Sequence, residues 1–366
     1  MTLPSKRIGY IDALRGFTMI LVVFSHIYIP NDTTINQFFV LFRMPLFFFI
    51  SGFISFRREQ SWTGRETITR LGSKLRTMIF PALTLGLLFT LVYNQTCDPV
   101  PITDFFTRPT KMGYWFTFAL FNMLVIYYTA RYLRERGRAS LESFAKWFFL
   151  VALVAFFALS DLSSLGDVDK VLTLSLTFEY LQYFAFGALC SCRREAFERT
   201  LDSGWRMAVV VVGLFVLSWW IIATDNYMVP ASCNIDRSIV VALNAVVRAM
   251  TGYFGIVTIF ALFRRAGEAF AENKFVGKPL QFVGRNTLDV YLLHYFVLLN
   301  FPALLRPFVV DTTGIIVPLV VGLTVAILVV AVSLLISRII RTSDLLAYYL
   351  LGARDVKLAT KHKASN

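Results

Sequence analysis

Charged side chains are scarce in this chain. Asp, Glu, Lys and Arg together make up only 16% of its 366 residues, whereas hydrophobic residues make up 57%. The mean hydropathy is +0.63, which lies outside the range of soluble proteins. This shortage of charge excludes an ordinary soluble domain and predicts a protein that lies mostly within a lipid bilayer.

Acidic residues are the rarer of the two charge signs, with 23 Asp and Glu against 36 Lys and Arg and a formal net charge of +13. A basic excess of this size is also found in proteins that bind nucleic acid. Here, however, most of the lysines and arginines fall in alternate segments between apolar stretches. This is the positive-inside pattern, so we expect both termini in the cytoplasm and no nucleic-acid partner.

Long apolar stretches are abundant, and their length and spacing predict the architecture. We expect an all-α polytopic membrane protein of about ten transmembrane helices, spanning residues 8–29, 36–56, 77–94, 114–133, 145–160, 173–191, 207–224, 238–263, 287–305 and 314–337. Residues 1–350 would form one transmembrane domain. The polar, basic residues 351–366 would form a cytoplasmic tail near the anionic inner leaflet.

Cysteine and histidine are rare, with four and three residues respectively. Cys190 and Cys192 form a Cys-x-Cys pair without a histidine nearby, which is a poor metal site, so we expect no bound metal. Cys97 and Cys233 fall in segments assigned to the external side. Because that compartment is oxidising, we expect the two thiols to lie close enough for a disulfide.

Ionisable residues inside apolar spans are costly, so those that occur mark functional positions or buried partners. The first span carries Asp12, Arg15 and His26. On a helix with 100° per residue, the eleven-residue step from Arg15 to His26 returns to nearly the same face, roughly 16 Å along the axis. Asp12 precedes Arg15 by one helical turn and shares that stripe. This helix therefore presents a basic group near its inner end and an imidazole near its outer end to one interior.

The same stretch resembles a known family. The similarity to the acyltransferase 3 family lies first in Asp-Ala-Leu-Arg-Gly at 12–16, in the spacing from Arg15 to His26, and in Arg-Met-Pro-Leu-Phe-Phe-Phe at 43–49. Segments later in the chain resemble further motifs of that family in the same order, at 114–121, 184–187 and 284–294. Members are integral-membrane O-acyltransferases that modify bacterial surface glycans. The resemblance implies acetyl-coenzyme A (acetyl-CoA) as donor, a glycan or glycolipid hydroxyl as acceptor, and the bacterial cytoplasmic (inner) membrane as location.

His26 and Arg15 are the strongest candidates for chemistry. A sugar hydroxyl is a weak nucleophile, and imidazole is suited to take its proton as a general base at neutral pH. An acyl-imidazole intermediate is one alternative, and a buried structural histidine is another. Arg15 is expected either to hold the anionic donor or to pair with Asp12. Asp12 is grouped with His26 as a catalytic candidate because it shares the stripe.

Eight further residues are candidates for binding donor or acceptor: Arg43, Lys74, Arg76, Trp115, Glu179, Arg248, Asn286 and His294. Arg43 is expected to face either Asp32 or the active cavity. Lys74 and Arg76 indicate a coenzyme-binding tendency or plain positive-inside charge. The family commonly has two arginines three apart in this region, whereas these two residues are two apart.

The remaining candidates each carry two interpretations. Trp115, like Tyr114, either stacks on a sugar or anchors the outer membrane boundary. Glu179 and Arg248 pair with each other, or Glu179 lines the cavity. Asn286 suits a helix N-cap or a coenzyme contact, and His294 belongs to the site or is a buried hydrogen-bonding residue. The small-residue step Ser51-Gly52 predicts close packing of helices.

Two other functions remain open from the sequence. A transporter or flippase for an acyl or carbohydrate substrate would also place Arg, His, Glu and Asp inside the membrane. No internal repeat or matched pair of broken helices supports that hypothesis. A membrane assembly or sensor protein without chemistry is the second. The acyltransferase hypothesis makes a structural demand: His26 should border a cavity that opens outward and continues inward past Arg15.

Overall fold

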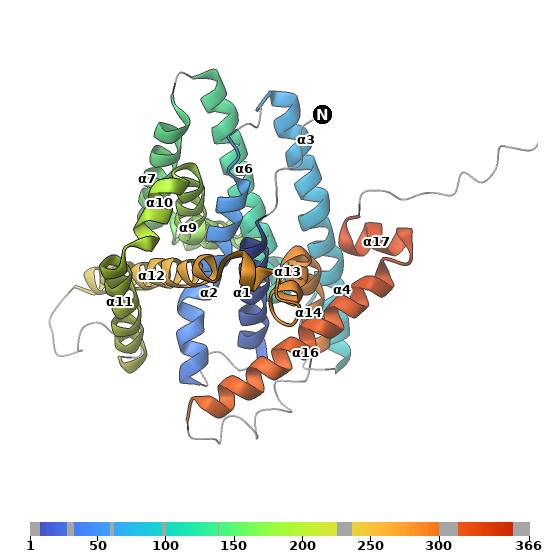
Figure 1. The fold of residues 1–366 in the computed structure, drawn as a ribbon. Helices are drawn as coiled ribbons and strands as arrows, with labels where there is room; N and C mark the ends of the chain where they lie inside the picture. The colour runs from blue at the N-terminus through green and yellow to red at the C-terminus, as the bar shows by residue number, and fades with distance from the viewer. Residues whose placement is uncertain are drawn as a thin grey trace, which may run out of the picture.

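The computed structural model describes residues 8–27, 33–58, 62–96, 100–137, 139–224, 236–299 and 314–353. Within these ranges every regular element is a helix (Figure 1). The long helices are α1 (Gly9–Ile27), α2 (Thr34–Ser55), α4 (Phe80–Thr96), α6 (Trp115–Arg136), α7 (Leu141–Leu159), α9 (Leu174–Cys192), α11 (Gly204–Ala223), α12 (Arg237–Ala271), α14 (Thr287–Leu298) and α16 (Ile316–Ile340).

Shorter elements connect these helices. They are α3 (Gly64–Lys74), the π turn η1 (Leu75–Ile79), α5 (Asp104–Thr107), the 3-10 turn η2 (Lys111–Gly113), the 3-10 turn η3 (Ser163–Leu165), α8 (Asp167–Leu172), α10 (Arg194–Asp202), α13 (Gly277–Arg285) and α17 (Asp344–Leu351). Because α3, η1 and α4 follow one another without a break, they form a single long rod.

Each of the ten expected spans contains one long helix, and seven helical stretches in the described residues are long and apolar enough to cross a membrane. They are α1, α2, the rod Gly64–Gln95, α7, α11, Ile239–Ala271 within α12, and α16. The others are α6, α9 and the short α14. The all-helical, multi-pass membrane architecture is thereby confirmed, whereas the count of ten and the cytoplasmic termini stay predictions.

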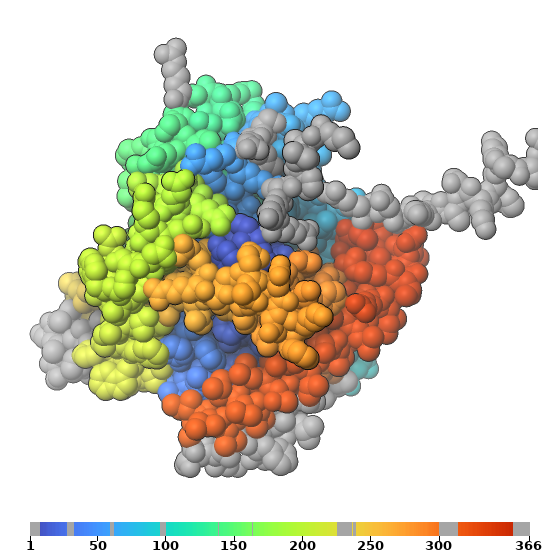
Figure 2. All heavy atoms as spheres, viewed as in Figure 1, coloured from blue at the N-terminus to red at the C-terminus, as the bar shows by residue number. Residues whose placement is uncertain are grey.

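Helix α1 lies at the centre of the bundle. Its apolar stretch is 78% buried, against 22% for α11 and 33% for α16. It packs against α2, α12, α13, α14 and α16, and α12 and α13 cover it on the face shown in Figure 2. The apolar surfaces that α11 and α16 leave uncovered are suited to lipid.

Two pairs of glycines let helix backbones touch. A Cβ on Gly16 would lie 2.0 Å from the Leu280 carbonyl oxygen, and one on Gly284 would lie 1.8 Å from the Asp12 carbonyl oxygen. Between α2 and α9, a Cβ on Gly52 would lie 1.9 Å from the Phe184 carbonyl oxygen, and one on Gly187 would lie 2.0 Å from the Phe49 carbonyl oxygen. Only glycine permits these approaches, so the close packing predicted from Ser51-Gly52 is confirmed.

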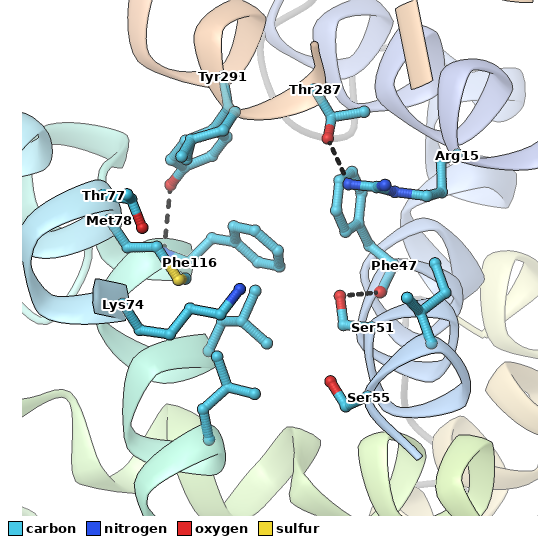
Figure 3. Close-up of a pocket in the computed structure, with 14 residues that line it drawn as sticks. Arg15, Phe47, Ser51, Ser55, Lys74, Thr77, Met78, Phe116, Thr287 and Tyr291 are labelled. Carbon is cyan, nitrogen blue, oxygen red and sulfur yellow. Dashed lines mark hydrogen bonds between the residues drawn. The ribbon is translucent and has the colours of Figure 1, made fainter. Parts of the chain in front are cut away.

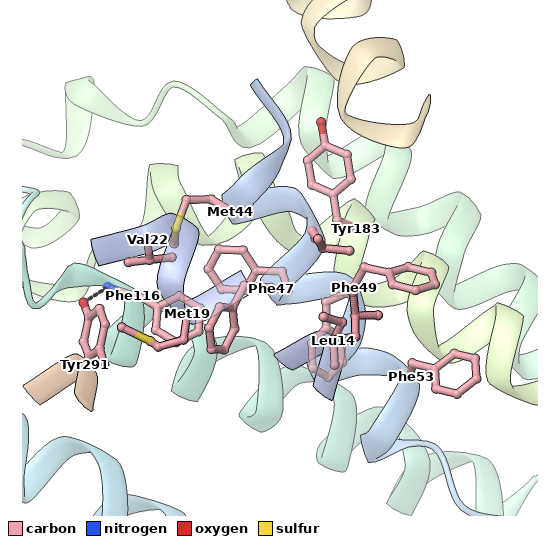
Figure 4. Packing of buried hydrophobic residues seen from close by; sticks show 14 of the residues in the cluster. Leu14, Met19, Val22, Met44, Phe47, Phe49, Phe53, Phe116, Tyr183 and Tyr291 are labelled. Carbon is pink, nitrogen blue, oxygen red and sulfur yellow. Dashed lines mark hydrogen bonds between the residues drawn. The ribbon is translucent and has the colours of Figure 1, made fainter. Parts of the chain in front are cut away.

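The interior is strongly aromatic. Phe48 and Phe49 of α2 are fully buried, and rings from α2, α6 and α14 pack together around Phe47, Phe116 and Tyr291 (Figure 4). Hydrogen bonds between side chains also connect helices near their ends. Asp289 of α14 accepts hydrogen bonds from Ser337 at 2.6 Å and Arg341 at 2.7 Å, which fixes α14 against α16.

Candidate functional site

A cavity of about 250 Å³ lies where α1, α2, α6, α14 and the start of the α3–α4 rod converge. Its charged lining residues are Arg15 and Lys74, which point into the space from opposite sides in Figure 3. Hydroxyl groups of serine, threonine and tyrosine side chains add uncharged polar groups to the cavity wall. The remaining lining residues are Phe47, Ser51, Ile54, Ser55, Thr77, Met78, Phe116, Leu120, Leu124, Thr287, Leu288 and Tyr291. A cavity with two cations and no lining carboxylate is suited to an anionic ligand with an apolar portion.

Arg15 is held at the wall by α14. Its Nη2 atom donates to Thr287 Oγ1 at 3.0 Å, and Thr287 is the first residue of α14. The close contact of Gly16 with α13, directly beside Arg15, sets the distance between the helices. Arg15 as a whole is half-buried and lines the cavity.

The opposite wall comes from an irregular turn. Lys74 ends α3, and Thr77 and Met78 belong to the π turn. Pro81, just beyond, lacks the N–H that an α-helix would use to bond the Thr77 carbonyl. π turns occur mostly as single turns inside α-helices, frequently at functional sites, and this one presents two residues to the cavity. Arg76 lies in the same turn but is not among the lining residues.

A second group of side chains, here called the histidine cluster, consists of His26, Arg43, His294 and Tyr295. The Tyr295 hydroxyl lies 3.2 Å from His26 Nε2, and the rings of His26 and His294 are 5.3 Å apart. Arg43 of α2 lies within electrostatic range of both His26 and Tyr295. His26 as a whole residue is half-buried.

His294 is the fully buried member of the cluster. Its Nδ1 lies 2.7 Å from the Tyr291 carbonyl oxygen and 3.1 Å from the Val290 carbonyl oxygen. Since both partners are acceptors, Nδ1 carries the proton. Its buried Nε2 is hydrogen-bonded to none of the described residues. His294 is therefore a buried hydrogen-bonding residue that is also a direct neighbour of His26, so both interpretations of it apply.

Arg43 approaches His26 with unused donors. Its Nε and Nη1 atoms are buried and form no hydrogen bond with any residue that the structure describes. Asp32, the other expected neighbour of Arg43, lies outside the described residues. The structure thus places Arg43 near the histidine cluster but not among the residues that line the cavity, and its expected role stays a prediction.

Arg15 and His26 share one face of α1, as the helical periodicity predicts. Arg15 contacts the first residue of α14, and His26 contacts Tyr295, two turns further along the same helix. The demand for a continuous cavity is not met in this conformation, because His26 is not among the residues that line the cavity. Phe116 and Tyr291 are among the residues that line the cavity, and Tyr291 also packs against His294.

Trp115 and Glu179 lie at the side of the histidine cluster. Trp115 packs on Tyr180 with ring centroids 5.6 Å apart, and Tyr180 lies within electrostatic range of Arg43. Glu179 is half-buried, hydrogen-bonds with Tyr180 and is within electrostatic range of Arg248, which is exposed. The boundary-anchor interpretation is wrong for Tyr114, which is fully buried and donates to the Leu292 carbonyl at 2.9 Å.

Asp12 and Asn286 lie at the opposite end of α1 from His26. Asp12 Oδ2 accepts from Arg285 Nε at 3.0 Å, so it serves at least one partner other than Arg15. It is roughly 21 Å from His26 along the helix axis, too far to touch the same reacting atoms. Asn286 occupies the N-cap position of α14, but its side chain donates back to the Phe282 carbonyl at 2.8 Å and does not cap α14.

The cysteines of the inner pair, Cys190 and Cys192, are buried free thiols. Cys97, Cys233 and His362 lie outside the described residues, so the structure does not test the disulfide. No group of three or more potential metal ligands occurs among the described residues.

Several site residues were missed by sequence reasoning. Thr287, Thr77, Tyr180 and Tyr295 carry ordinary side chains in apolar or hydroxyl-rich stretches. One feature of the sequence could have pointed to Tyr295 as a site residue. It follows His294 directly and lies one turn after Tyr291, so the two tyrosines share a helix face.

Comparison with known proteins gives one finding. A family model described as an acyltransferase domain matches residues 8–338, a range that includes the cavity and the histidine cluster. No curated protein and no solved structure matches the chain.

Proposed function

Since the chain belongs to the acyltransferase 3 family, we propose that it moves an acetyl or other short acyl group from coenzyme A to a hydroxyl of a glycan or glycolipid. The acyltransferase class follows from the family. The donor, the acceptor, the location in a bacterial inner membrane and the residue roles are our proposals. The observation that carries them is the placement of a basic cavity and an imidazole cluster on one face of α1.

The donor enters the cavity between Arg15 and Lys74. Both cations are suited to the phosphates of coenzyme A, and the guanidinium can bind two oxygens at once. A volume of about 250 Å³ is below the roughly 300–1,000 Å³ of pockets that hold a whole small molecule. The cavity therefore accommodates the slender arm that ends in the thioester, with the diphosphate at the root of that arm between Arg15 and Lys74, while the adenosine part stays outside, near Arg76.

His26 acts as the general base. It takes the proton of the acceptor hydroxyl while the hydroxyl oxygen attacks the thioester carbonyl carbon. The tetrahedral intermediate then expels the coenzyme A thiolate, which receives the proton from His26. Each step conserves protons and charge, and no metal is needed.

Arg43 stabilises the negative charge that develops on the carbonyl oxygen. Its buried Nε and Nη1 donors lack partners among the described residues and lie in the neighbourhood of His26. Donors fixed in this way ahead of the reaction supply transition-state stabilisation without reorganisation. Since Tyr291 lines the cavity and also packs against His294, we propose that the thioester reaches His26 when the rings of Phe116 and Tyr291 move apart.

The decisive experiment uses His26→Gln in detergent-purified or nanodisc-embedded protein. Glutamine keeps volume and hydrogen bonding but cannot take the proton, and general-base help is typically worth ~10²–10⁴ in rate. We expect consumption of acetyl-CoA in the presence of surface-glycan extract to fall by that factor. Binding of acetyl-CoA, measured calorimetrically, should persist because Arg15 and Lys74 are unchanged.

The same assay separates the rival functions. Gly72→Ala serves as the matched control, because it lies on α3 with no atom within 4 Å of an added Cβ. A transporter would bind or move a substrate without consuming the thioester. Full activity of His26→Gln would show that His26 is a packing residue and would overturn the mechanism.

A further inference from the structure

The turn that precedes α6 has an uncommon backbone. Lys111, Met112 and Gly113 follow one another with φ of 47°, 51° and 101°. Left-handed conformations at two successive non-glycine residues are disfavoured and persist where the surroundings hold them. Lys111 is buried, and its Nζ donates to the Lys170 carbonyl at 2.9 Å. This contact links the turn to α8.

The turn places the backbone carbonyl of Gly113 in contact with α14. The Gly113 oxygen accepts from the Tyr291 hydroxyl at 2.6 Å and from the Tyr295 hydroxyl at 3.2 Å. A Cβ at position 113 would lie 2.1 Å from the Tyr295 ring, so only glycine allows this approach. A carbonyl oxygen has two lone pairs, and both are occupied here.

Each tyrosine hydroxyl has only one proton to donate, and this limits the possible hydrogen-bond patterns around Gly113 and His26. The Phe116 N–H donates to the Tyr291 hydroxyl at 3.1 Å (Figure 4), so the single hydroxyl proton of Tyr291 goes to Gly113. The Tyr295 hydroxyl has two neighbours, the Gly113 oxygen and His26 Nε2, both at 3.2 Å. Gly113 can only accept. When Tyr295 donates to Gly113, His26 Nε2 must carry a proton and donate to Tyr295.

We propose that Tyr295 is a positioning residue that holds His26 in the Nε2–H tautomer, so that Nδ1 is the atom that takes the acceptor proton. The inference rests on the proposed function, because it assigns the base within that same site. None of the described residues hydrogen-bonds to Nδ1 of His26. The opposite tautomer would leave an Nδ1–H without a described acceptor and would tie up the Nε2 lone pair.

The chain of hydrogen bonds from His26 through Tyr295 to the Gly113 carbonyl, here called the relay, also stabilises His26 when it is protonated and positively charged. When Nδ1 takes the proton from the acceptor hydroxyl, Nε2–H keeps donating to Tyr295, and Tyr295 keeps donating to the Gly113 carbonyl. No proton has to move along the relay, and the carbonyl dipole faces the new positive charge through the hydroxyl. The role is comparable to that of a carboxylate that orients a catalytic histidine, with a backbone carbonyl and a tyrosine in its place.

The test is nitrogen NMR of the full chain with ¹⁵N-labelled histidine, together with steady-state kinetics. His26→Gln identifies the His26 signals, and His294, whose Nδ1 carries the proton, supplies an internal signal of the opposite tautomer. We expect wild-type His26 as Nε2–H. In Tyr295→Phe we expect a mixture of tautomers and a kcat at least about tenfold lower, with KM for acetyl-CoA unchanged.

Tyr291→Phe is the matched control for the spectrum. It removes the neighbouring hydroxyl on the same carbonyl but no contact of His26, so the His26 tautomer should stay Nε2–H. Nδ1–H on wild-type His26 overturns the proposal without any variant. Unchanged tautomer and kcat in Tyr295→Phe overturn it as well, and the proposed function then stands if His26→Gln is inactive. An active His26→Gln instead overturns the proposed function itself.

Discussion

Arg15 and Lys74 bring two positive charges to one cavity, but the structural elements that position the two side chains differ. Arg15 is anchored on Thr287 of α14 at 3.0 Å, whereas Lys74 projects from the last residue of α3, beside the π turn. A guanidinium fixed on one side presents its remaining donors in a planar fork, which an ammonium cannot reproduce. At the scale of residues, specificity for the donor is therefore expected to reside in Arg15.

Arg15→Lys tests this assignment. The substitution keeps the charge and removes the fork, so we expect the Kd for acetyl-CoA to rise about tenfold, the equivalent of one lost charge-assisted hydrogen bond. Titration calorimetry measures it, and a thermal unfolding curve should be nearly unchanged. Arg65→Lys on the exposed face of α3 is the control. If Arg15 only neutralised Asp12, lysine would bind the donor as well as arginine does.

At the scale of elements, the site depends on how closely α1 approaches α13 and α14. Gly16 and Gly284 bring the backbones of α1 and α13 into contact, and the Asp12–Arg285 ion pair closes the same interface. Arg285 ends α13 and Thr287 begins α14, with Asn286 as the single residue between them. A shift of α13 would therefore displace Thr287 and with it the anchor of Arg15.

Gly16→Ala is expected to break this interface. The new methyl group would lie 2.0 Å from the Leu280 carbonyl oxygen, and overpacking of this kind costs about 1–3 kcal/mol. We expect a lower Tm together with weaker acetyl-CoA binding. Gly72→Ala provides the contrast: its Cβ meets nothing within 4 Å, and alanine favours a helix over glycine by about 1 kcal/mol. Equal effects of the two substitutions would contradict the packing argument.

At the scale of the whole molecule, the interior helices are more polar than the peripheral ones. Asn122 of α6 donates to the Leu172 carbonyl at 2.7 Å and to Thr177 of α9 at 3.0 Å. Polar side chains with partners inside the bundle lower the mean hydropathy of α6 and α9. The predicted span at α14 differs for another reason, because that helix is short.

The predicted orientation can be tested by labelling from each side. In a cysteine-free background, Ile102→Cys and Glu195→Cys place single thiols at exposed positions, just before α5 and in α10 respectively. If both termini are cytoplasmic, an impermeant maleimide should label the cysteine at 102 in intact cells. It should label the one at 195 only in inverted vesicles. The reverse pattern would overturn the orientation and place the donor cavity on the wrong side for cytoplasmic coenzyme A.

The sequence by itself determined the class of molecule and the relation between Arg15 and His26. The length of an apolar stretch indicates whether it lies in a membrane, and the helical period determines which residues share a face. Both are local properties of the chain, so the sequence alone is sufficient for them. The partners of those residues were decided only by the tertiary structure. His26 meets Tyr295, Asp12 meets Arg285 and Arg15 meets Thr287 across about 270 residues of chain. No local period encodes these contacts, because they depend on the glycine-mediated approach of α13 to α1 and on the strained turn that carries the Gly113 carbonyl to α14.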